Sequence, residues 1–455
     1  MYKRTEELLR DKGIIIPEVA QSNIYECNEW YKGELTAFHS RHSLGGYDYD
    51  LLRLNFAKRV CSDEAGLCEI INLNAEDKTA DEFINSVLKA NRFDTMYREQ
   101  LESMSATGTV GAYVYIEGAS LYDNGEIRGG NIKVSYCKAE NIIPITVENN
   151  GITECAFTGS NMVNGKREDK VIIYRIVNGK YQVEIVTGTE KDTIVEPAQT
   201  LGDVRPFAVM RLAEVNNKPH MKGYGYPKLL DSIPYLKGLE LAYNVLYGDI
   251  DKADKVVLIN SALTETDSKG KHYLSDEQKK YFVSLSEKLP EQDSMIKEYN
   301  PVIRATELTE VFELVLSLLS QQYGYGNKKY SFEHGTVTTA TQYILEKSAE
   351  MQSLNKQRFQ SVQYIEDIVK AILWFTNTYQ DKAFNIDEPL NIDFDDSIIT
   401  DKQAHLDSMR TDAITFDIPQ LKITYLCEKY GWTEKEAKGY IEESDLDIET
   451  PESIE

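Results

Sequence analysis

Hydrophobic residues recur at helical spacing in several stretches of the N-terminal part of the chain. Residues 50–61 carry apolar side chains three or four positions apart, which predicts an amphipathic helix. The positions concerned are Leu51, Leu54, Ala57 and Cys61. Further helices are predicted over about 79–89, where Thr79 begins a capping box, and over about 95–106. This part of the chain is therefore expected to begin with helices.

From about residue 112 to residue 215 the pattern changes to short runs of β-branched and aromatic residues. Asn-Gly dipeptides, which favour the tight turns of β-hairpins, separate these runs. They begin at Asn124, Asn150, Asn164 and Asn178. The region is therefore predicted to form an antiparallel meander. Asn164-Gly-Lys is the nearest approach to a phosphate loop, but no GxxxxGK[ST] pattern surrounds it, and a turn explains it fully.

Two amphipathic helices and one very long helix are predicted in the second half of the chain. The two amphipathic stretches are 227–253 and 306–323, and Thr306 is expected to cap the second. Between them, a strand at 255–259 and a polar stretch predict a small projecting subdomain. The long helical pattern covers 339–378, roughly 40 residues or about 60 Å. A helix of this length is expected to span separate parts of the structure.

A segment rich in Gly, Thr and Tyr precedes the long helix. It carries Asn327, Lys328, Lys329 and His334 but a single acid, Glu333, in an otherwise acidic chain. Flexible lysines of this kind can make weak, exchanging contacts with phosphate groups. An ordinary solvated loop explains the same composition. The sequence leaves both interpretations open.

The formal net charge of −24 argues against a protein that holds nucleic acid in place, because phosphate binding depends on clusters of Lys and Arg. The charge is compatible with an acidic conduit that repels a moving duplex, and also with a protein that never meets DNA.

The 455 residues indicate about two to four structural units. The 29 tyrosines suit broad, partly wet subunit contacts, although Tyr-rich strands explain the same count.

An acidic cluster is the one candidate for metal-dependent chemistry. It comprises Asp393, Asp395, Asp396 and Asp401, and carboxylates of this kind can hold Mg²⁺ for phosphodiester cleavage. The sequence shows no motif that pairs the cluster with a base or a charge stabiliser, and Asp and Ser also begin turns and caps. A structural role is therefore favoured. No catalytic residue, metal or cofactor is predicted.

The remaining reactive residue types form no recognisable site. The six cysteines are scattered, which predicts a reducing compartment, and the six histidines lie in polar surroundings and are expected at the surface. His39 and His42 are the closest pair, beside Gly45 and Gly46, and give little support for a metal site. The sequence has no signal peptide and no run long enough to span a membrane, so a soluble protein without membrane contact is expected.

Five stretches of the chain, in this order, resemble the portal proteins of tailed bacteriophages, in particular those from siphophages of Gram-positive bacteria. They are Leu54-Asn-Phe-Ala-Lys-Arg-Val-Cys, Thr107-Gly-Thr-Val-Gly-Ala, Gly223-Tyr-Gly-Tyr-Pro, Thr338-Thr-Ala-Thr-Gln and Ile392-Asp-Phe-Asp-Asp-Ser-Ile-Ile-Thr-Asp. Each is degenerate alone, and their order over most of one chain carries the resemblance.

The resemblance implies an α+β portal architecture, assembled as a ring of usually twelve subunits. It divides the chain into segments with separate expected roles. These are a wing (1–222), a first stem helix (223–254), a clip (255–304), a second stem helix (305–323), a tunnel loop (324–338), a tunnel helix (339–380), a β return into the wing (381–400) and a short helical crown with an acidic tail (401–455).

The resemblance also implies the function and the partners. The ring would form the channel at one capsid vertex of the virion, through which double-stranded DNA is packaged and ejected, after assembly in the bacterial cytoplasm. Terminase and head-completion or connector proteins would dock on the clip, for which Asp276, Lys279, Lys280 and Glu291 are candidates. Capsid and scaffolding proteins are further expected partners. Two alternatives stay open: another head or tail subunit, or a Mg²⁺-dependent phosphodiesterase.

Overall fold

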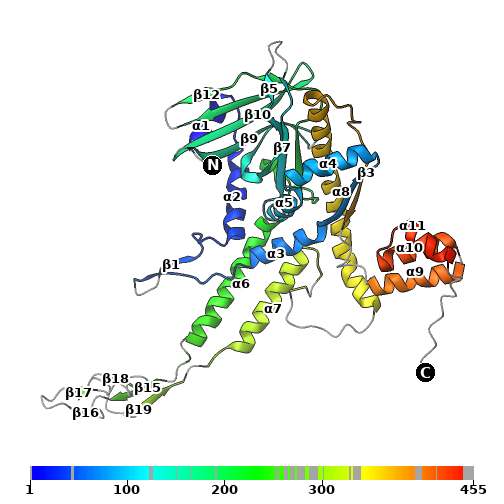
Figure 1. Cartoon of the computed structure of the whole chain (residues 1–455). Helices are drawn as coiled ribbons and strands as arrows, with labels where there is room; N and C mark the ends of the chain where they lie inside the picture. Colours follow the sequence, from blue (N-terminus) through cyan, green and yellow to red (C-terminus); the bar gives the residue numbers. More distant parts are fainter. Residues whose placement is uncertain are drawn as a thin grey trace. The chain divides into compact units, whose positions relative to one another are not determined.

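The computed structural model contains helices and sheets, which confirms the predicted α+β class (Figure 1). The chain forms two compact units, residues 1–66 with 75–390 and residues 67–74 with 391–455, and each has its own hydrophobic core. The structure describes residues 3–42, 46–121, 127–149, 151–163, 165–189, 192–251, 253, 256–260, 265–266, 272–273, 282–285, 296–300, 302–326, 329–330, 340–394, 402–416 and 418–443.

Helices open the first unit, as the sequence predicts. They are α1 (Lys3–Asp11), α2 (Glu18–Lys32), α3 (Phe56–Ala65), α4 (Lys78–Ala90) and α5 (Phe93–Thr107). The predicted start of α3 is wrong by about six residues, because Asn55 adopts a left-handed conformation with φ of 50° and keeps Leu51 and Leu54 out of the helix. A short β1 (Ser40–His42) and β2 (Asp48–Asp50) pair with each other between α2 and α3.

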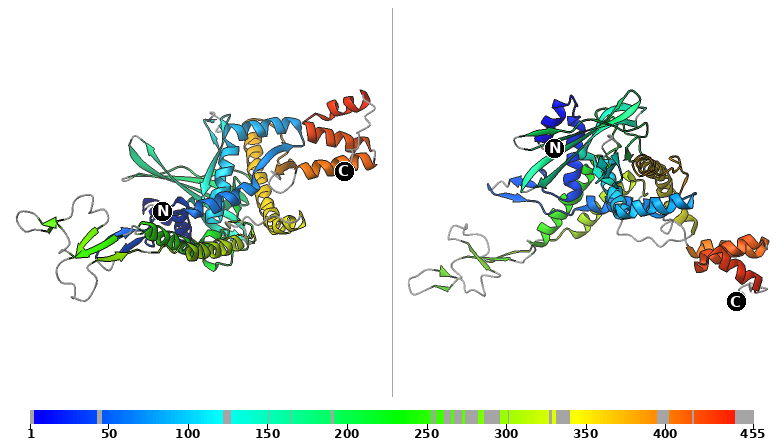
Figure 2. Two further views of the ribbon diagram at one scale, coloured as in Figure 1. Left: turned by 90° about the horizontal axis from the view of Figure 1, so that it is seen from below. Right: turned by 45° about the horizontal axis from the view of Figure 1, so that its top comes forward.

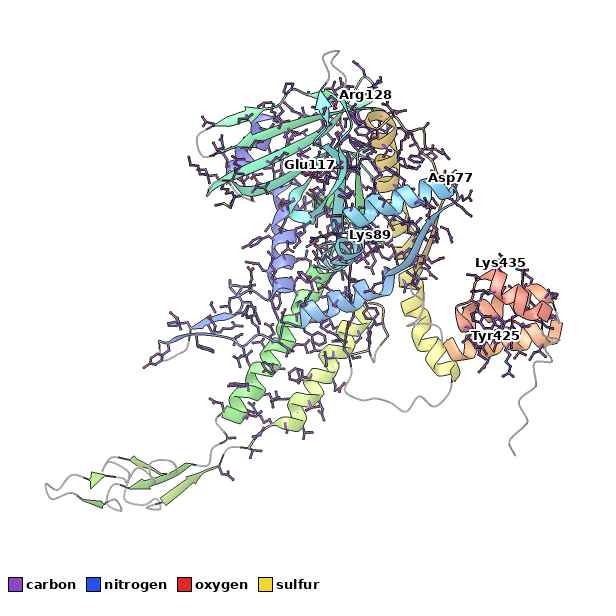
Figure 3. All side chains as sticks on the ribbon, in the orientation of Figure 1. Asp77, Lys89, Glu117, Arg128, Tyr425 and Lys435 are labelled. Atoms are coloured by element: carbon purple, nitrogen blue, oxygen red, sulfur yellow. The ribbon has the colours of Figure 1, made fainter. Side chains whose placement is uncertain are left out.

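The cap of α4 also differs from the prediction. The Asp77 side chain accepts the backbone N–H groups of Thr79 and Ala80 at 2.8 and 2.9 Å, so Asp77 caps the helix in place of Thr79 (Figure 3). The helix buries Ala80, Ile84 and Leu88. A carboxylate just before a helix satisfies free N–H groups as well as a threonine does, and sequence pattern alone does not decide between them.

The predicted meander is present as an antiparallel sheet in the order β12-β11-β10-β9-β8. Its strands are β8 (Ile142–Glu148), β9 (Gly151–Val163), β10 (Lys166–Val177), β11 (Lys180–Gly188) and β12 (Thr193–Val195), with β13 (Gln199–Thr200) paired to β11. Asn178 and Gly179 have φ of 52° and 75°, which are the positive values required by a two-residue hairpin turn between Val177 and Lys180.

A second sheet has the order β14-β4-β7 and packs with the first around aromatic side chains. It consists of β4 (Thr109–Glu117), β7 (Asn131–Lys138) and β14 (Phe207–Arg211), while β5 (Ser120–Leu121) and β6 (Ile127–Arg128) form a short hairpin. Phe157, Tyr174 and Phe207 contact one another at ring centroid distances of 5.5 to 6.0 Å. Three short 3-10 turns follow α3, β7 and β14; they are η1 (Gly66–Cys68), η2 (Ala139–Asn141) and η3 (Pro219–Met221).

The predicted second-half helices are present as α6 (Lys228–Asp251), α7 (Ala305–Gln322) and α8 (Ala340–Tyr379). Between α6 and α7 lie β15 (Val256–Asn260), β16 (Glu265–Thr266), β17 (His272–Tyr273), β18 (Phe282–Leu285) and β19 (Ile296–Tyr299), with sheet order β18-β15-β19. Thr306 does not cap α7, because the helix already begins at Ala305. None of the helices in the described ranges combines the length and apolar character that a membrane span requires.

In its described residues, the second unit contains a two-stranded sheet and three helices. The strands are β3 (Ile70–Ala75) and β20 (Leu390–Phe394), and the helices are α9 (Lys402–Phe416), α10 (Pro419–Tyr430) and α11 (Glu434–Glu443). The predicted turn and cap are confirmed: Gly431 has φ of 69°, and Thr433 and Glu436 exchange hydrogen bonds. Residues 444–455, most of the predicted acidic tail, lie outside the described residues.

Candidate functional site

Helices α6 and α7 pack along each other and carry β15–β19 at their far end (Figures 1 and 2). Gly238 leaves space for Val315, whose methyl carbons would lie 3.8 and 3.9 Å from a Cβ added at Gly238. Toward the far end, the Arg304 guanidinium donates two hydrogen bonds to the Asp249 carboxylate, at 2.8 and 2.9 Å. The two helices therefore form one helical hairpin, with a paired ionic contact close to the strands.

Both helices of the hairpin also expose apolar side chains. On α7, Val311, Leu314 and Leu318 are 44%, 61% and 37% exposed; they follow a spacing of three and four residues and form one row, here named the α7 strip. The residues that α7 buries occupy a different face; they are Phe312, Leu316 and Leu319. On α6, Leu241 and Val245 are exposed on one face, and Tyr247 and Ile250, three residues apart, are exposed on another; the second pair is here named the α6 patch. Contiguous apolar surface of this kind is typical of a protein contact.

Lys228, the first residue of α6, is almost completely buried, with 1% of its side chain exposed. Its Nζ lies 3.3 Å from a carboxylate oxygen of Glu64 and 3.0 Å from one of Glu214, and it donates to the backbone carbonyl of Tyr323 at 3.2 Å. Burial acts to lower the pKa of Lys228, but the two carboxylates outweigh it and leave the pKa above its ordinary value. Lys228 therefore joins the start of α6 to α3 and to the end of α7.

His39 is a second buried contact to α6, and the prediction that it lies at the surface is wrong. Its side chain is 2% exposed, and its Nε2 lies 2.7 Å from a carboxylate oxygen of Glu240, which is also buried. The backbone N–H of Thr36 donates to Nδ1 at 3.1 Å, so Nε2 carries the proton shared with Glu240. His42 instead contacts Asp48 at 2.7 Å. The two histidines therefore do not form a common site.

Asn244 fixes the chain before α3 to the same helix. Its side-chain oxygen accepts the backbone N–H of Leu52 at 2.8 Å, and its side-chain N–H group donates to the carbonyl of Leu52 at 2.8 Å. Sequence reasoning missed these anchors. The available signal was a charged residue inside an apolar stripe, because Glu240 stands between Leu239 and Leu241.

Two of the motifs that carry the family resemblance meet at the base of α6. A Cβ added to Gly225 would lie 2.0 Å from the carbonyl oxygen of Gly108, and Gly108 itself has φ of 79°. The backbone N–H of Gly225 donates a hydrogen bond to the Thr109 hydroxyl oxygen at 2.8 Å. Only glycine fits such a close backbone approach. The segment that leads into α6 is therefore held directly against the end of α5.

The segment after α7 begins as a cluster of aromatic rings. Tyr323 is fully buried and stacks on Tyr325 at 6.1 Å, and Tyr325 meets the edge of Tyr330 at 6.2 Å. The Nζ of Lys329 lies 3.9 Å from the centre of the Tyr325 ring, which is a cation–π contact. Asn327, Lys328 and His334, and the clip candidates Asp276, Lys279, Lys280 and Glu291, lie outside the described residues.

The second half of α8 packs into the core of the first unit. It buries Tyr364, Ile365, Ile368 and Ile372, and the Tyr364 hydroxyl donates to the side-chain oxygen of Gln100 on α5. The Gln357 side chain accepts the backbone N–H of Ala213 at 2.8 Å. The long helix therefore joins the segment after α7 to the sheets.

Asp367 on α8 pairs with Arg205, yet burial keeps the pKa of Asp367 above its ordinary value. Its ionisation therefore lowers stability as the pH rises from about 4 toward neutrality. Because Arg205 is partly exposed and can regain water, Asp367→Asn is expected to change the free energy of unfolding by less than about 1 kcal/mol at pH 7. The variant should gain stability relative to the wild type between pH 4 and pH 7, as measured by denaturant unfolding.

Asp387→Asn is the matched control, since Asp387 is exposed and pairs with Lys370, which lies on α8 like Asp367. The free energy of unfolding of this control variant should change little at pH 4 and at pH 7. A loss of about 3 kcal/mol in Asp367→Asn at pH 7 would mean that the ion pair outweighs burial.

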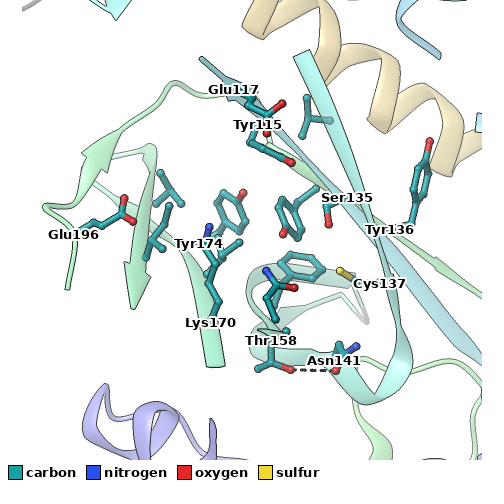
Figure 4. Close-up of a pocket in the computed structure, with 18 of the residues that line it drawn as sticks. Tyr115, Glu117, Ser135, Tyr136, Cys137, Asn141, Thr158, Lys170, Tyr174 and Glu196 are labelled. Atoms are coloured by element: carbon teal, nitrogen blue, oxygen red, sulfur yellow. Dashed lines mark hydrogen bonds between the residues drawn. The ribbon is translucent and has the colours of Figure 1, made fainter. Parts of the chain in front are cut away.

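A cavity of about 1320 Å³ lies among the strands of the two larger sheets (Figure 4). Tyr113, Tyr174, Thr158, Lys170 and Cys137 are among the residues that line it. Burial raises the pKa values of Tyr113 and Cys137 to about 12, so both stay protonated at neutral pH. Neither group is therefore a ready nucleophile.

The acidic cluster is described only in part. Asp393 lies on β20 and is exposed, while Asp395, Asp396 and Asp401 lie outside the described residues. Within the part of the chain that the structure describes, no group of three His, Cys, Asp or Glu residues is arranged to hold a metal ion.

A family model described as "Phage portal protein, SPP1 Gp6-like" matches residues 21–420. No curated protein matches the sequence. A chain from the solved structure "Neck of native GTA particle computed with C12 symmetry" is similar at 9% identity, with 78% of this chain and 83% of that chain covered and a TM-score of 0.38. A similarity at this level carries no inference about this chain.

Proposed function

Because the chain belongs to the family of SPP1 Gp6-like phage portal proteins, we propose that its copies assemble into a ring that forms the DNA channel at one vertex of the capsid. Phage portal proteins are structural components of the virion. The genome passes through the ring during packaging and ejection, and a separate ATPase supplies the work. The predicted number of subunits is twelve.

The exposed apolar side chains of the helical hairpin are the observation that supports a ring. In a closed ring of heterologous contacts, each copy presents two different surfaces, and each surface is covered by a neighbour. The α7 strip and the α6 patch are two such surfaces on adjacent helices of one subunit. On this proposal α6 and α7 are the stem, residues 1–222 the wing, residues 255–304 the clip and residues 401–455 the crown.

The DNA contacts are proposed for the segment 324–338 between the stem and the tunnel helix. Lys328, Lys329, Asn327 and His334 would face the duplex and make weak, sequence-independent contacts with phosphate groups. The cation–π contact of Lys329 with Tyr325 supports this, because it holds a positive charge next to the end of a stem helix. Terminase and connector proteins would dock on the clip, where Asp276, Lys279, Lys280 and Glu291 are the candidates.

Replacing both Lys328 and Lys329 with alanine is expected to leave ring assembly intact and to reduce the amount of DNA retained per head. Fewer phosphate contacts release fewer counterions, so retention should also depend less on salt. DNA content per head at two salt concentrations, measured in particles assembled from the variant, checks this.

A control removes the same charge at another place. Lys435 and Lys438 are exposed residues of α11, and replacing both with alanine should leave DNA retention unchanged. If the Lys328 and Lys329 variant retains DNA like the wild type at both salt concentrations, these lysines do not contact the channel DNA.

A further inference from the structure

The β1–β2 hairpin, here named the arm (residues 40–42 and 46–50), is a two-stranded ribbon whose β2 residues are all exposed. Tyr47 and Tyr49 are 75% and 52% exposed. An isolated two-stranded hairpin is marginally stable in water. Exposed tyrosines on such a ribbon are typical of a contact surface, because a tyrosine ring covers a large area at low entropic cost.

The base of the arm is fixed rigidly to α6. His39 is bound to Glu240 at its first end, and Leu52 is bound to Asn244 just beyond its second. Phe38 packs against His39 at 5.3 Å. The arm therefore keeps a defined position relative to α6.

The arm projects from the α6–α7 helical hairpin on the side of α6 that faces away from α7 (Figure 1 and the right view of Figure 2). Leu52, next to its base, is 41% exposed and is bound to Asn244, which lies three residues before Tyr247 of the α6 patch and therefore on the same face of the helix. The arm and the α6 patch are therefore parts of one continuous flank. Helix α7 lies on the other side of α6 from the arm and so forms the opposite flank (Figure 1).

The base of the arm is basic and helix α7 is acidic, so the two flanks carry complementary charges. Arg41 and Lys237 lie 5.0 and 5.6 Å from the Phe38 ring. Helix α7 carries Glu307, Glu310 and Glu313 and no Lys or Arg. The acids of the arm have partners within it, because Asp48 contacts His42 at 2.7 Å and Asp50 accepts the Ser40 hydroxyl at 3.1 Å.

From these observations we infer that the arm packs against α7 of a second copy of this chain. The inference rests on the proposed ring, in which one flank of each subunit meets the opposite flank of the next. Tyr47 and Tyr49 cover the α7 strip of the neighbour, and the basic groups at the base of the arm face the three glutamates. The arm thus adds to the contact between neighbouring stems, and it connects the wing of one subunit to the stem of the next.

Photo-crosslinking tests this contact in the assembled full chain. With p-benzoylphenylalanine in place of Tyr49, irradiation should produce a ladder of covalent dimers, trimers and larger species, and the linked peptide should map to residues 305–322. The same probe combined with Leu314→Glu, which is expected to prevent assembly, should give no ladder, and this control shows that the ladder comes from assembled rings. Tyr47→Ser with Tyr49→Ser should leave the subunit folded and raise the concentration needed for half assembly by about tenfold or more.

The outcomes separate this inference from the proposed function. Rings that form normally but give no ladder, or a ladder whose linked peptide lies outside residues 305–322, overturn the inference and leave the ring intact. Rings of the double serine variant that are as stable as the wild type also overturn it. Absence of rings in the wild type overturns both.

Discussion

Replacing Lys228 with methionine is expected to lower the free energy of unfolding of the first unit by about 3–5 kcal/mol. Methionine keeps most of the buried volume but removes the charge that compensates Glu64 and Glu214. Glu64 is the more critical partner, because its side chain is only 14% exposed while that of Glu214 is 42% exposed. An uncompensated carboxylate would then remain beside Tyr323 at the end of α7. Thermal and denaturant unfolding of the full chain measure the loss.

Two further variants separate charge from packing at this site. Adding Glu64→Gln to Lys228→Met should recover part of the lost stability, because the carboxylate no longer needs compensation. Lys222→Met changes an exposed lysine six positions earlier and should alter the free energy of unfolding by no more than about 0.5 kcal/mol. Equal effects of Lys222→Met and Lys228→Met would contradict the role given to the buried network.

Replacing Leu314 with glutamate is expected to abolish ring assembly while leaving the subunit folded. Leu314 is 61% exposed in the subunit, so the charge is hydrated there and the melting temperature should change little. In the proposed ring the same position would be covered, and each interface would have to bury an unpaired charge next to Val311 and Leu318. Since the cost recurs at every interface, the variant should stay monomeric at concentrations that fully assemble the wild type.

Thr309→Glu provides the control on the same helix. Thr309 is exposed and lies on the face of α7 opposite the α7 strip, so the variant adds the same charge without entering the proposed contact. It should assemble like the wild type. Sedimentation velocity of the two variants at matched concentrations compares them, and assembly of Leu314→Glu into rings would contradict the proposed role of the strip.

The element types followed from the sequence where the pattern was long or the turn chemistry was specific. The spacing of apolar residues located α6, α7 and the 40-residue α8, and the Asn178-Gly179 dipeptide located a hairpin turn. The predicted boundaries differ from the observed ones, because boundaries depend on distant residues. The start of α3 is set by the left-handed Asn55, and the chain before it is held by Asn244 from nearly two hundred residues away.

The buried ionic contacts could not be predicted from local pattern. Lys228 finds its partners on α3, on the segment after β14 and at the end of α7, and His39 finds Glu240 on α6. In the sequence these are ordinary polar residues, and only the tertiary fold brings them together. The candidate DNA contacts came from composition and family resemblance, and of these Lys329 alone falls within the described residues.

The central claim is that copies of this chain close into a ring around a channel. Negative-stain imaging of the purified full chain, combined with its native mass, tests it most directly. The account predicts closed rings with a central hole wide enough for duplex DNA and a mass close to twelve subunits. Monomers, extended sheets or tubes at every concentration would contradict it.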